Sequence, residues 1–274
     1  MAVEPSSSAL PFDTSDAAIA KLWRKGHALE FEGRYLESAR VYEELAGRLP
    51  GVSHIAWRIA RNRYLVAKGL PLSDRAGRLE QFQLTEDWAG RGIEADSACA
   101  ECYLYKFIGM SRRATTQGLL SSAKNAKTMA RLLDRAFELL PSHVDNEWNS
   151  ELGNLYYAAG VFYRSVPEGS LLSWTIGVKG DLDRSIELLR KANEITDSRI
   201  DYHIELGATL QCAGSRRGRD ALTAEGRKLL QAIPALPTRQ PSDAVDREHA
   251  VILIERPDES CDYSREAWIE KDPS

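Results

Sequence analysis

Cysteines and histidines are the residues of this chain whose types could support redox or metal chemistry. Cys99 and Cys102 lie within "CAEC", a Cys-x-x-Cys spacing typical of redox pairs and of half a zinc site. A zinc site needs a second pair, whereas Cys212 and Cys261 are isolated in the sequence. The alternative interpretation is that Cys99 and Cys102 are small apolar residues at a helix–helix contact. We favour this packing role and leave the redox and metal interpretations open.

The five histidines each lack a second ligand at the spacing that a metal site requires. The chain also carries no phosphate-binding loop, dinucleotide-binding glycine motif, nucleophile elbow or zinc-protease histidine pair. We therefore expect no catalytic residue, no metal site and no cofactor. The histidines are His27, His54, His143, His203 and His249.

Composition and charge narrow the class of protein. The 274 residues are 43% hydrophobic and 28% charged, which favours a globular chain with an ample core over a disordered one. The formal net charge is −4, but residues 241–274 alone hold ten acidic and four basic residues. The remainder is therefore nearly neutral and lacks the basic field of a nucleic-acid-binding protein. We expect no nucleic-acid partner.

Hydropathy along the chain bears on its cellular location. No apolar run approaches the roughly 18 residues that suggest a membrane span. The first residues, "MAVEPSSSALPFDTSD", lack the basic patch and apolar stretch of a secretory leader. These features predict a cytoplasmic protein without a membrane span. A periplasmic location is the alternative, if a leader peptide has been removed.

A recurring pattern of apolar, small and turn residues predicts paired helices. In "GDLDRSIELLRKANEITD" (180–197), Leu182, Ile186 and Leu189 lie on one helical face. The stretch 22–50 ends in the same pattern, with Tyr42 at the place of Leu189, and supplies a preceding helix. Further pairs are predicted at 54–69 with 78–96, 99–110 with 126–141, 147–163 with 180–197, and 202–214 with 219–234.

Packing explains why these residue types recur. Gly26, Gly153 and Gly207 would allow the two helices of a hairpin to approach closely, and Pro50 and Pro141 would end the second helices. One hairpin cannot bury its apolar face alone, so neighbouring hairpins must stack. The pattern resembles the tetratricopeptide repeat. This resemblance implies an all-α fold, a right-handed superhelix of about five antiparallel helix hairpins with loop insertions.

Three segments interrupt the repeat pattern and are expected to be loop insertions: 70–77, 111–122 and 164–180. The third contains Leu171, Leu172, Trp174 and Ile176 and is too apolar for a free loop. We expect it to fold back onto the helices, either filling a gap in the core or forming the wall of a ligand pocket.

Degenerate repeats with such insertions also resemble two further families over roughly residues 50–235. These are the T-component subunit of tripartite ATP-independent transporters and the regulator-of-microtubule-dynamics group. The T-component resemblance implies a helical lipoprotein that oligomerises and docks a periplasmic solute receptor. No lipid-attachment cysteine lies near the start of this sequence.

The predicted organisation has three parts. Residues 1–17 form a flexible N-terminal segment, residues 18–240 form the helical-repeat domain, and residues 241–274 form an acidic capping helix and tail. The tail has a helical core at 243–255 that either caps the last hairpin or lies in the groove as an autoinhibitory segment. We favour the capping role.

The tetratricopeptide resemblance implies a concave groove, lined by the first helix of each hairpin, that binds a protein or peptide. Arg58 and Asn62, one turn apart, resemble part of a clamp for a peptide carboxylate. We therefore predict a non-catalytic scaffold or adaptor, and leave self-association open. The alternative is a transport-associated accessory protein that docks a solute receptor or holds a small apolar ligand against Tyr105, Phe107, Tyr157, Phe162 and Trp174. The predicted groove residues are Trp23, His27, Arg58, Asn62, Tyr105, Asn154, Tyr157 and Trp174.

Overall fold

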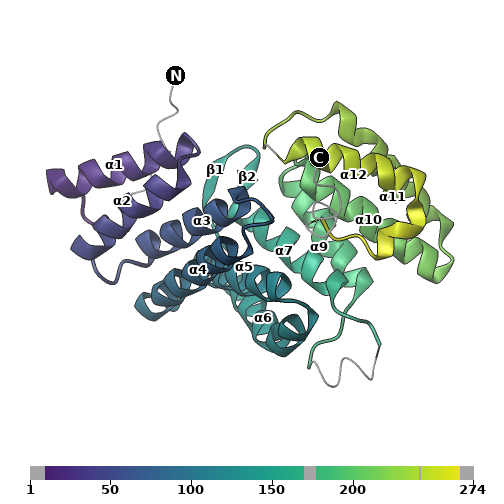
Figure 1. Cartoon of the computed structure of the whole chain (residues 1–274), viewed down its shortest axis with the longest axis horizontal. Coiled ribbons are helices and arrows are strands. Elements are labelled where there is room, and N and C mark those ends of the chain that lie inside the picture. The colour runs from purple at the N-terminus through teal and green to yellow at the C-terminus, as the bar shows by residue number, and fades with distance from the viewer. Residues whose placement is uncertain (1–9, 170–176, 241, 266–274) are drawn as a thin grey trace. The chain divides into compact units, whose positions relative to one another are not determined.

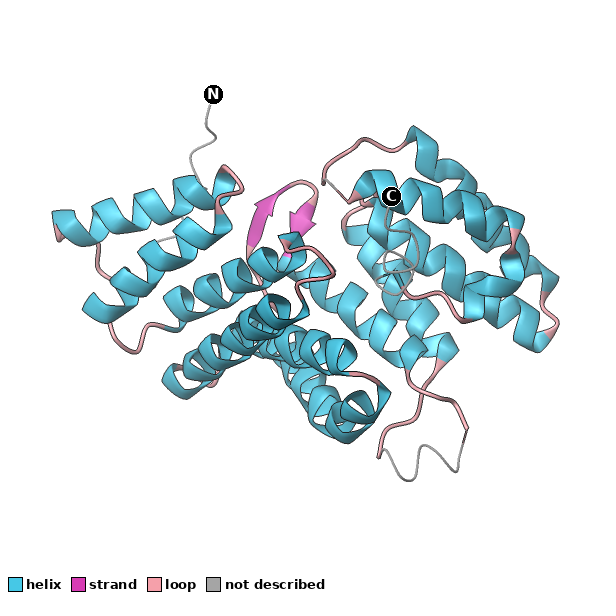
Figure 2. Ribbon diagram, in the orientation of Figure 1, coloured by secondary structure: helices cyan, strands magenta, loops and turns pink. Residues whose placement is uncertain are grey.

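A computed structural model of the chain describes residues 10–169, 177–240 and 242–265. The chain divides into two compact units, unit 1 (Met1–Pro141) and unit 2 (Ser142–Ser274). Helices dominate the described part of both units, and a short two-stranded hairpin is the exception there (Figure 2).

Unit 1 consists of helices that pack in chain order, each against the next (Figure 1). Asp16 and Asp74 begin two of them, because each carboxylate accepts a hydrogen bond from a first-turn backbone N–H group. Gly33 has φ +76° in the turn of the first hairpin, a conformation that favours glycine. The helices are α1 (Ala17–Phe31), α2 (Tyr35–Arg48), α3 (Ser53–Gly69), α4 (Arg75–Ala95), α5 (Ala100–Gln117) and α6 (Leu119–Leu139).

Unit 2 begins with two short antiparallel strands that precede its first helix. Helices then pack in chain order, α7 on α9, α9 on α10, α10 on α11 and α11 on α12. The elements are β1 (Val144–Asn146), β2 (Asn149–Ser150), α7 (Glu151–Ser165), α9 (Leu182–Ile195), α10 (Ile200–Arg217), α11 (Asp220–Ala232), α12 (Asp243–Glu255) and the 3₁₀ helices η1 (Ile233–Ala235) and η2 (Pro257–Cys261).

The predicted all-α fold of stacked antiparallel hairpins is confirmed. Among the described residues, the helix pairs α1–α2, α3–α4, α5–α6, α7–α9 and α10–α11 match the five predicted pairs. Helix α12 lies at the range predicted for the C-terminal helix and packs against α10 and α11. The predicted boundaries at residues 17 and 240 stay predictions, and the division after Pro141 had no counterpart in the sequence interpretation.

Several local predictions were wrong. Residues 111–122 are not an inserted loop, because α5 continues to Gln117 and Gly118 alone joins it to α6. The segment 70–77 is shorter than predicted, since α4 begins at Arg75. Residues 147–150 belong to a strand hairpin, in which the Trp148 N–H donates to Asn146 Oδ1 at 3.1 Å, rather than to a helix. Leu171, Leu172, Trp174 and Ile176 lie outside the described residues.

Some of the predicted glycines allow two helices to approach closely. A Cβ atom at Gly26 would lie 2.6 Å from the Tyr42 ring of α2, and one at Gly207 would lie 2.8 Å from Leu230 of α11. At Gly153 the nearest atoms are 3.4 Å away, an ordinary contact. The close contact between α7 and α9 is instead made at Gly160, where a Cβ atom would lie 2.6 Å from Leu189. The prediction was therefore correct for Gly26 and Gly207 and wrong for Gly153.

Candidate partner-binding site

The predicted groove residues of unit 1 form an aromatic and cationic layer across α1, α3 and α5. The Arg58 guanidinium lies 4.6 Å from the Trp57 ring centroid and 5.8 Å from that of Trp23. Trp57 stacks against Tyr105, with 6.2 Å between centroids, and Trp23 lies 6.4 Å from the half-buried His27 ring. The structure thus brings Trp23, His27, Arg58 and Tyr105 together, although only His27 among them is more than marginally exposed.

Arg58 belongs to a buried polar group that we call the Glu30 cluster: Glu30, Tyr42, Arg58 and Arg61. The Arg58 and Arg61 guanidinium groups lie 3.1 Å and 3.2 Å from the Glu30 carboxylate, and these three side chains are at most 9% exposed. The Tyr42 hydroxyl donates to Glu30 Oε2 at 3.3 Å. Burial and the Glu30 charge both raise the pKa of Tyr42, so its hydroxyl stays protonated. The carboxylate that Arg58 binds is therefore the chain's own.

Asn62 forms a hydrogen bond within its own helix, α3. Its side chain is fully buried, and Nδ2 donates to the Arg58 carbonyl oxygen at 2.9 Å. Both side chains of the predicted carboxylate clamp are thus engaged inside unit 1. A buried charged group without its partner is costly, which explains why these contacts organise α1, α2 and α3.

The predicted residues of unit 2 lie on α7 beside the start of α10. Asn154 accepts a hydrogen bond from the Tyr202 hydroxyl at 2.8 Å. Tyr157 stacks on the Tyr202 ring, with 4.8 Å between centroids and 20° between planes. Asn154 and Tyr157 are both half-buried, so part of each side chain faces solvent. Trp174 lies outside the described residues.

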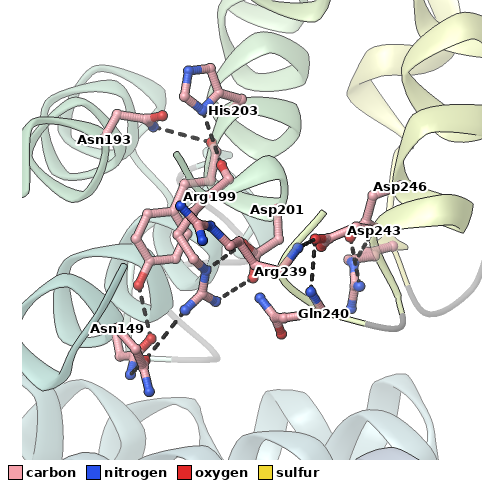
Figure 3. A network of polar contacts seen from close by, with 12 residues as sticks. Asn149, Asn193, Arg199, Asp201, His203, Arg239, Gln240, Asp243 and Asp246 are labelled. Carbon is pink, nitrogen blue, oxygen red and sulfur yellow. Dashed lines mark hydrogen bonds and ion pairs between the residues drawn. The ribbon is translucent and has the colours of Figure 1, made fainter. Parts of the chain in front are cut away.

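A polar network fixes the start of α10 (Figure 3). Arg199 makes a bidentate pair with Asp201 at 2.8 and 2.6 Å and reaches Asn149 Oδ1 at 3.4 Å. Burial alone would lower the pKa of Arg199, but the Asp201 charge and neighbouring tyrosines raise it above its ordinary value. His203 Nδ1 lies 3.0 Å from the Arg199 carbonyl oxygen, and burial lowers the pKa of this histidine. These contacts tie α10 to the β1–β2 hairpin.

Asp243 fixes the turn before α12 on the other side of the same network (Figure 3). Its Oδ2 accepts the backbone N–H groups of Arg239 and Gln240 at 2.6 and 2.9 Å. The burial of acids such as Asp243, Asp201 and Glu30 had no counterpart among the sequence predictions. No local sequence signal marks them, since their partners are brought in by the fold.

The C-terminal residues 257–265, which we call the strap, lie across α7, α10 and α12 in unit 2. Arg164 of α7 donates to the carbonyl oxygens of Ser260 and Tyr263 at 3.4 and 2.7 Å. The Ser260 hydroxyl donates to Gln211 Oε1 of α10 at 2.5 Å. Beyond them, Arg265 makes a bidentate pair with the buried Asp246 of α12.

Burial along α10 shows how completely the strap and its neighbours cover this helix. Every residue from Ile200 to Gly214 except His203 is buried. The ring of Tyr263 is 3% exposed and joins the apolar cluster of Ile204, Ala208 and Leu253. Burial, followed by the charges of Glu205 and Asp246, raises the pKa of Tyr263. The strap therefore covers part of α10 and buries the ring of Tyr263 there.

All four cysteines are paired, which corrects the prediction that Cys212 and Cys261 are isolated. Cys99 is bonded to Cys102, and Cys212 of α10 is bonded to Cys261 of the strap. An even cysteine number was the available sequence signal, but the distance along the chain hid the second pair. Within the described residues, no group of three or more histidine, cysteine or acidic residues could hold a metal ion.

The described residues among those predicted to line an apolar ligand pocket are divided between the two units. Tyr105 and Phe107 are buried in the core of unit 1, and Phe162 is buried in unit 2. A hollow of about 330 Å³ lies elsewhere, between α2, α4 and the start of α3. Its lining includes Leu49, Val52, Ala56, Trp88 and Arg91.

Two solved structures are similar to this chain, both at low sequence identity. No known family and no curated protein matches the sequence. The solved structure "MamA RS-1 ArsTM double mutant" is 14% identical with a TM-score of 0.45, covering 80% of this chain and 98% of that chain. "MamA 41-end from Desulfovibrio magneticus RS-1" is 15% identical with a TM-score of 0.44, covering 82% of this chain and 100% of that chain. At such identities and TM-scores, neither likeness carries an argument about function.

No helix in the described part of the chain is both long and apolar enough to cross a membrane.

Proposed function

We propose that this chain is a non-catalytic helical-repeat scaffold that binds a protein or peptide partner on the faces of its first helices. The observation that carries the proposal is the strap of unit 2, where α7 and α10 hold a chain segment by its main-chain carbonyls and one tyrosine ring. Hydrogen bonds to the main chain and buried aromatic anchors are among the means by which protein surfaces bind peptides. Stacked hairpins offer the same kind of face more than once.

The contact residues in this proposal are those of the predicted groove that reach solvent. His27 in unit 1 and Asn154 and Tyr157 in unit 2 are half-buried, so they can touch a partner. Trp23 lies beside His27 in unit 1, where Tyr105 is buried, while Arg58 and Asn62 organise α3. Trp174 remains a predicted contact outside the described residues.

Site-specific photo-crosslinking in the native cell tests this function. A photoreactive amino acid is placed at His27 or Tyr157, and in control variants at the exposed Glu44 of α2 or Glu187 of α9. We expect a macromolecule to be captured from position 27 and from position 157, each in its own unit, and none from positions 44 and 187. Equal capture from all four positions, or none from any, would contradict the assignment.

Oxidation state bears on the location in which this scaffold works. Both cysteine pairs are disulfide-bonded, and disulfides persist in oxidising compartments. This supports the periplasmic alternative over the cytoplasm. Alkylation with a mass-tagged maleimide in intact cells distinguishes them, because a protein that is oxidised in place takes up no tag until it is reduced.

The hollow beside Trp88 supports a second candidate function, the binding of a small apolar ligand. Its volume of about 330 Å³ and its lining of Leu49, Val52 and Trp88 suit an apolar group, with Arg91 at 4.5 Å from the Trp88 ring. Quenching of tryptophan fluorescence by such a ligand, lost in Trp88→Phe, would support it. Unchanged quenching in Trp88→Phe would place the ligand elsewhere.

A further inference from the structure

We propose that the face of α7 and α10 recognises a peptide of defined chemistry, that the strap fills this face in the oxidised chain, and that reduction of Cys212–Cys261 opens it. This inference rests on the proposed scaffold function and deepens it, because it names the surface, the partner chemistry and the control.

The contacts of the strap define what an outside partner must present. Ser260 supplies a hydroxyl to Gln211, and Tyr263 supplies a ring to the apolar cluster around Ile204. Arg265 supplies a guanidinium to the buried Asp246 carboxylate. The partner is therefore a segment with a serine, a tyrosine three residues later and an arginine two residues after that.

Arg164 makes the surface suited to a peptide rather than to a folded helix. Two of its N–H groups point to main-chain carbonyls, and its Nη2 also lies 2.9 Å from the Glu205 carboxylate. Carbonyls inside a regular helix are used by the helix itself, whereas the two that Arg164 binds come from the end of η2 and the segment after it. Glu205 in turn holds Arg164 in place, since both side chains are at most 5% exposed.

The covalent bond is placed where it can control this occupancy. Cys261 lies between the two residues whose carbonyls Arg164 binds, so the disulfide tethers the strap at its centre. Cys212 is 2% exposed, whereas Cys261 is half-buried and is therefore the more accessible cysteine of this pair. In contrast, Cys99 and Cys102 are 7% and 0% exposed, which shields that pair from attack.

The opening step needs a dithiol reductant. Its thiolate attacks Cys261 Sγ, the S–S bond breaks, and Cys212 leaves as a thiolate that takes up a proton. The second thiol of the reductant then attacks the mixed disulfide and releases Cys261 as a thiol. Two electrons pass to the protein, which gains two thiols, while the dithiol becomes a cyclic disulfide.

After reduction the strap is held only by non-covalent contacts, and a partner segment competes with it. A tethered segment has an effective concentration of roughly millimolar. A weakened strap is therefore required to measure binding in trans. Tyr263→Ala removes the anchor of the strap while it leaves Arg164, Gln211 and Asp246 in place.

The test measures fluorescence anisotropy of a labelled synthetic peptide that has the sequence of residues 256–265 and carries Cys261→Ser. The full chain with Tyr263→Ala is titrated before and after treatment with dithiothreitol. We expect binding at least tenfold tighter after reduction. The double variant Tyr263→Ala/Arg164→Lys keeps a positive charge beside Glu205 but loses the guanidinium that donates to two carbonyls. We expect its affinity for the labelled peptide to be at least tenfold lower.

Two results would overturn the proposal: equal affinity before and after reduction, or no binding by a reduced chain that circular dichroism shows to be folded. If Tyr263→Ala does not fold, trypsin cleavage of the wild-type chain after Arg265 replaces it. We expect cleavage at least tenfold faster after reduction, and no effect of dithiothreitol on Cys212→Ser/Cys261→Ser. A cleavage rate that does not change on reduction would contradict the proposed opening of the strap. Failure of the photo-crosslinking experiment alone would contradict only the scaffold function.

Discussion

The two units cover the faces of the first helices of their hairpins in different ways. In unit 1 the Glu30 cluster closes the contact between α1, α2 and α3 with side chains that belong to the helices themselves. In unit 2 the face of α7 and α10 is closed by the strap, a separate segment tethered by one disulfide. A helix side chain cannot leave without unfolding, whereas a strap can. The same architecture therefore offers one permanent and one removable closure.

The disulfides follow the same division. Cys99–Cys102 joins residues three apart inside unit 1 and restrains little chain, whereas Cys212–Cys261 spans 49 residues of unit 2. The loop-entropy relation assigns about 2 kcal/mol to the short loop and about 4 kcal/mol to the long one. The long bond thus combines the larger stabilisation with the more exposed cysteine, Cys261.

The largest effect is expected at the permanent closure. Glu30→Ala leaves Arg58 and Arg61 buried without their carboxylate, so we expect a loss of about 3–5 kcal/mol in the free energy of unfolding. Urea denaturation measures it. Glu44→Ala, which removes an exposed pair with Arg48, is the matched control and should cost at most about 1 kcal/mol. Equal losses in both variants would show that the Glu30 cluster does not close unit 1.

Removal of each disulfide compares the two closures directly. We expect Cys212→Ser/Cys261→Ser to lower the free energy of unfolding by about 4 kcal/mol and Cys99→Ser/Cys102→Ser by about 2 kcal/mol, since the stabilisation grows with loop length. Denaturant titration of both double variants gives the ratio. The reverse order would contradict the role of the long bond in unit 2.

Helix spacing gives a smaller contrast. A Cβ atom at Gly226 would lie 2.6 Å from the Gly207 carbonyl oxygen, so Gly226→Ala should destabilise the chain by about 1–3 kcal/mol. Gly47 of α2 has no atom within 4 Å of such a Cβ, and Gly47→Ala should stabilise it by about 0.5–1 kcal/mol. Thermal melts of both variants check the signs. Similar midpoints would mean that α10 and α11 can separate at little cost.

The smallest expected effect concerns pH. Burial lowers the pKa of His203 from its ordinary 6.5, so the folded state binds this proton less readily than the unfolded state. Its contribution to stability is complete above pH 6.5 and is lost as the pH falls through the lower folded value. His203→Gln should flatten the fall in stability below pH 6.5. An unchanged pH profile would assign that slope to other groups.

Much of the fold could be predicted from the sequence because helix pairing depends on residues that lie close together in the chain. Gly26, Gly207 and the apolar positions around Leu189 marked the hairpins, since close approach and burial depend on residues a few positions apart. The strap and the Cys212–Cys261 bond could not be found in this way. Their partners lie 49 or more residues away, and only the three-dimensional packing brings Arg164 and Gln211 to Ser260.

The candidate site illustrates the same limit. The spacing of Arg58 and Asn62 indicated part of a carboxylate clamp. The sequence could not reveal that Arg58 is already paired with Glu30. Tyr157 and Asn154 were placed correctly on α7, but their contact with Tyr202 depends on how the next hairpin stacks. Spacing identifies a helix face, whereas burial decides which of its side chains a partner can reach.

Hydrogen exchange of the wild-type chain, oxidised and reduced in parallel, tests the contrast between the two closures most directly. We predict that dithiothreitol raises amide exchange at least tenfold in residues 258–263 and leaves α1–α3 unchanged. Exchange in the strap that stays as slow as in the Glu30 region after complete reduction of Cys212–Cys261 would contradict the removable closure.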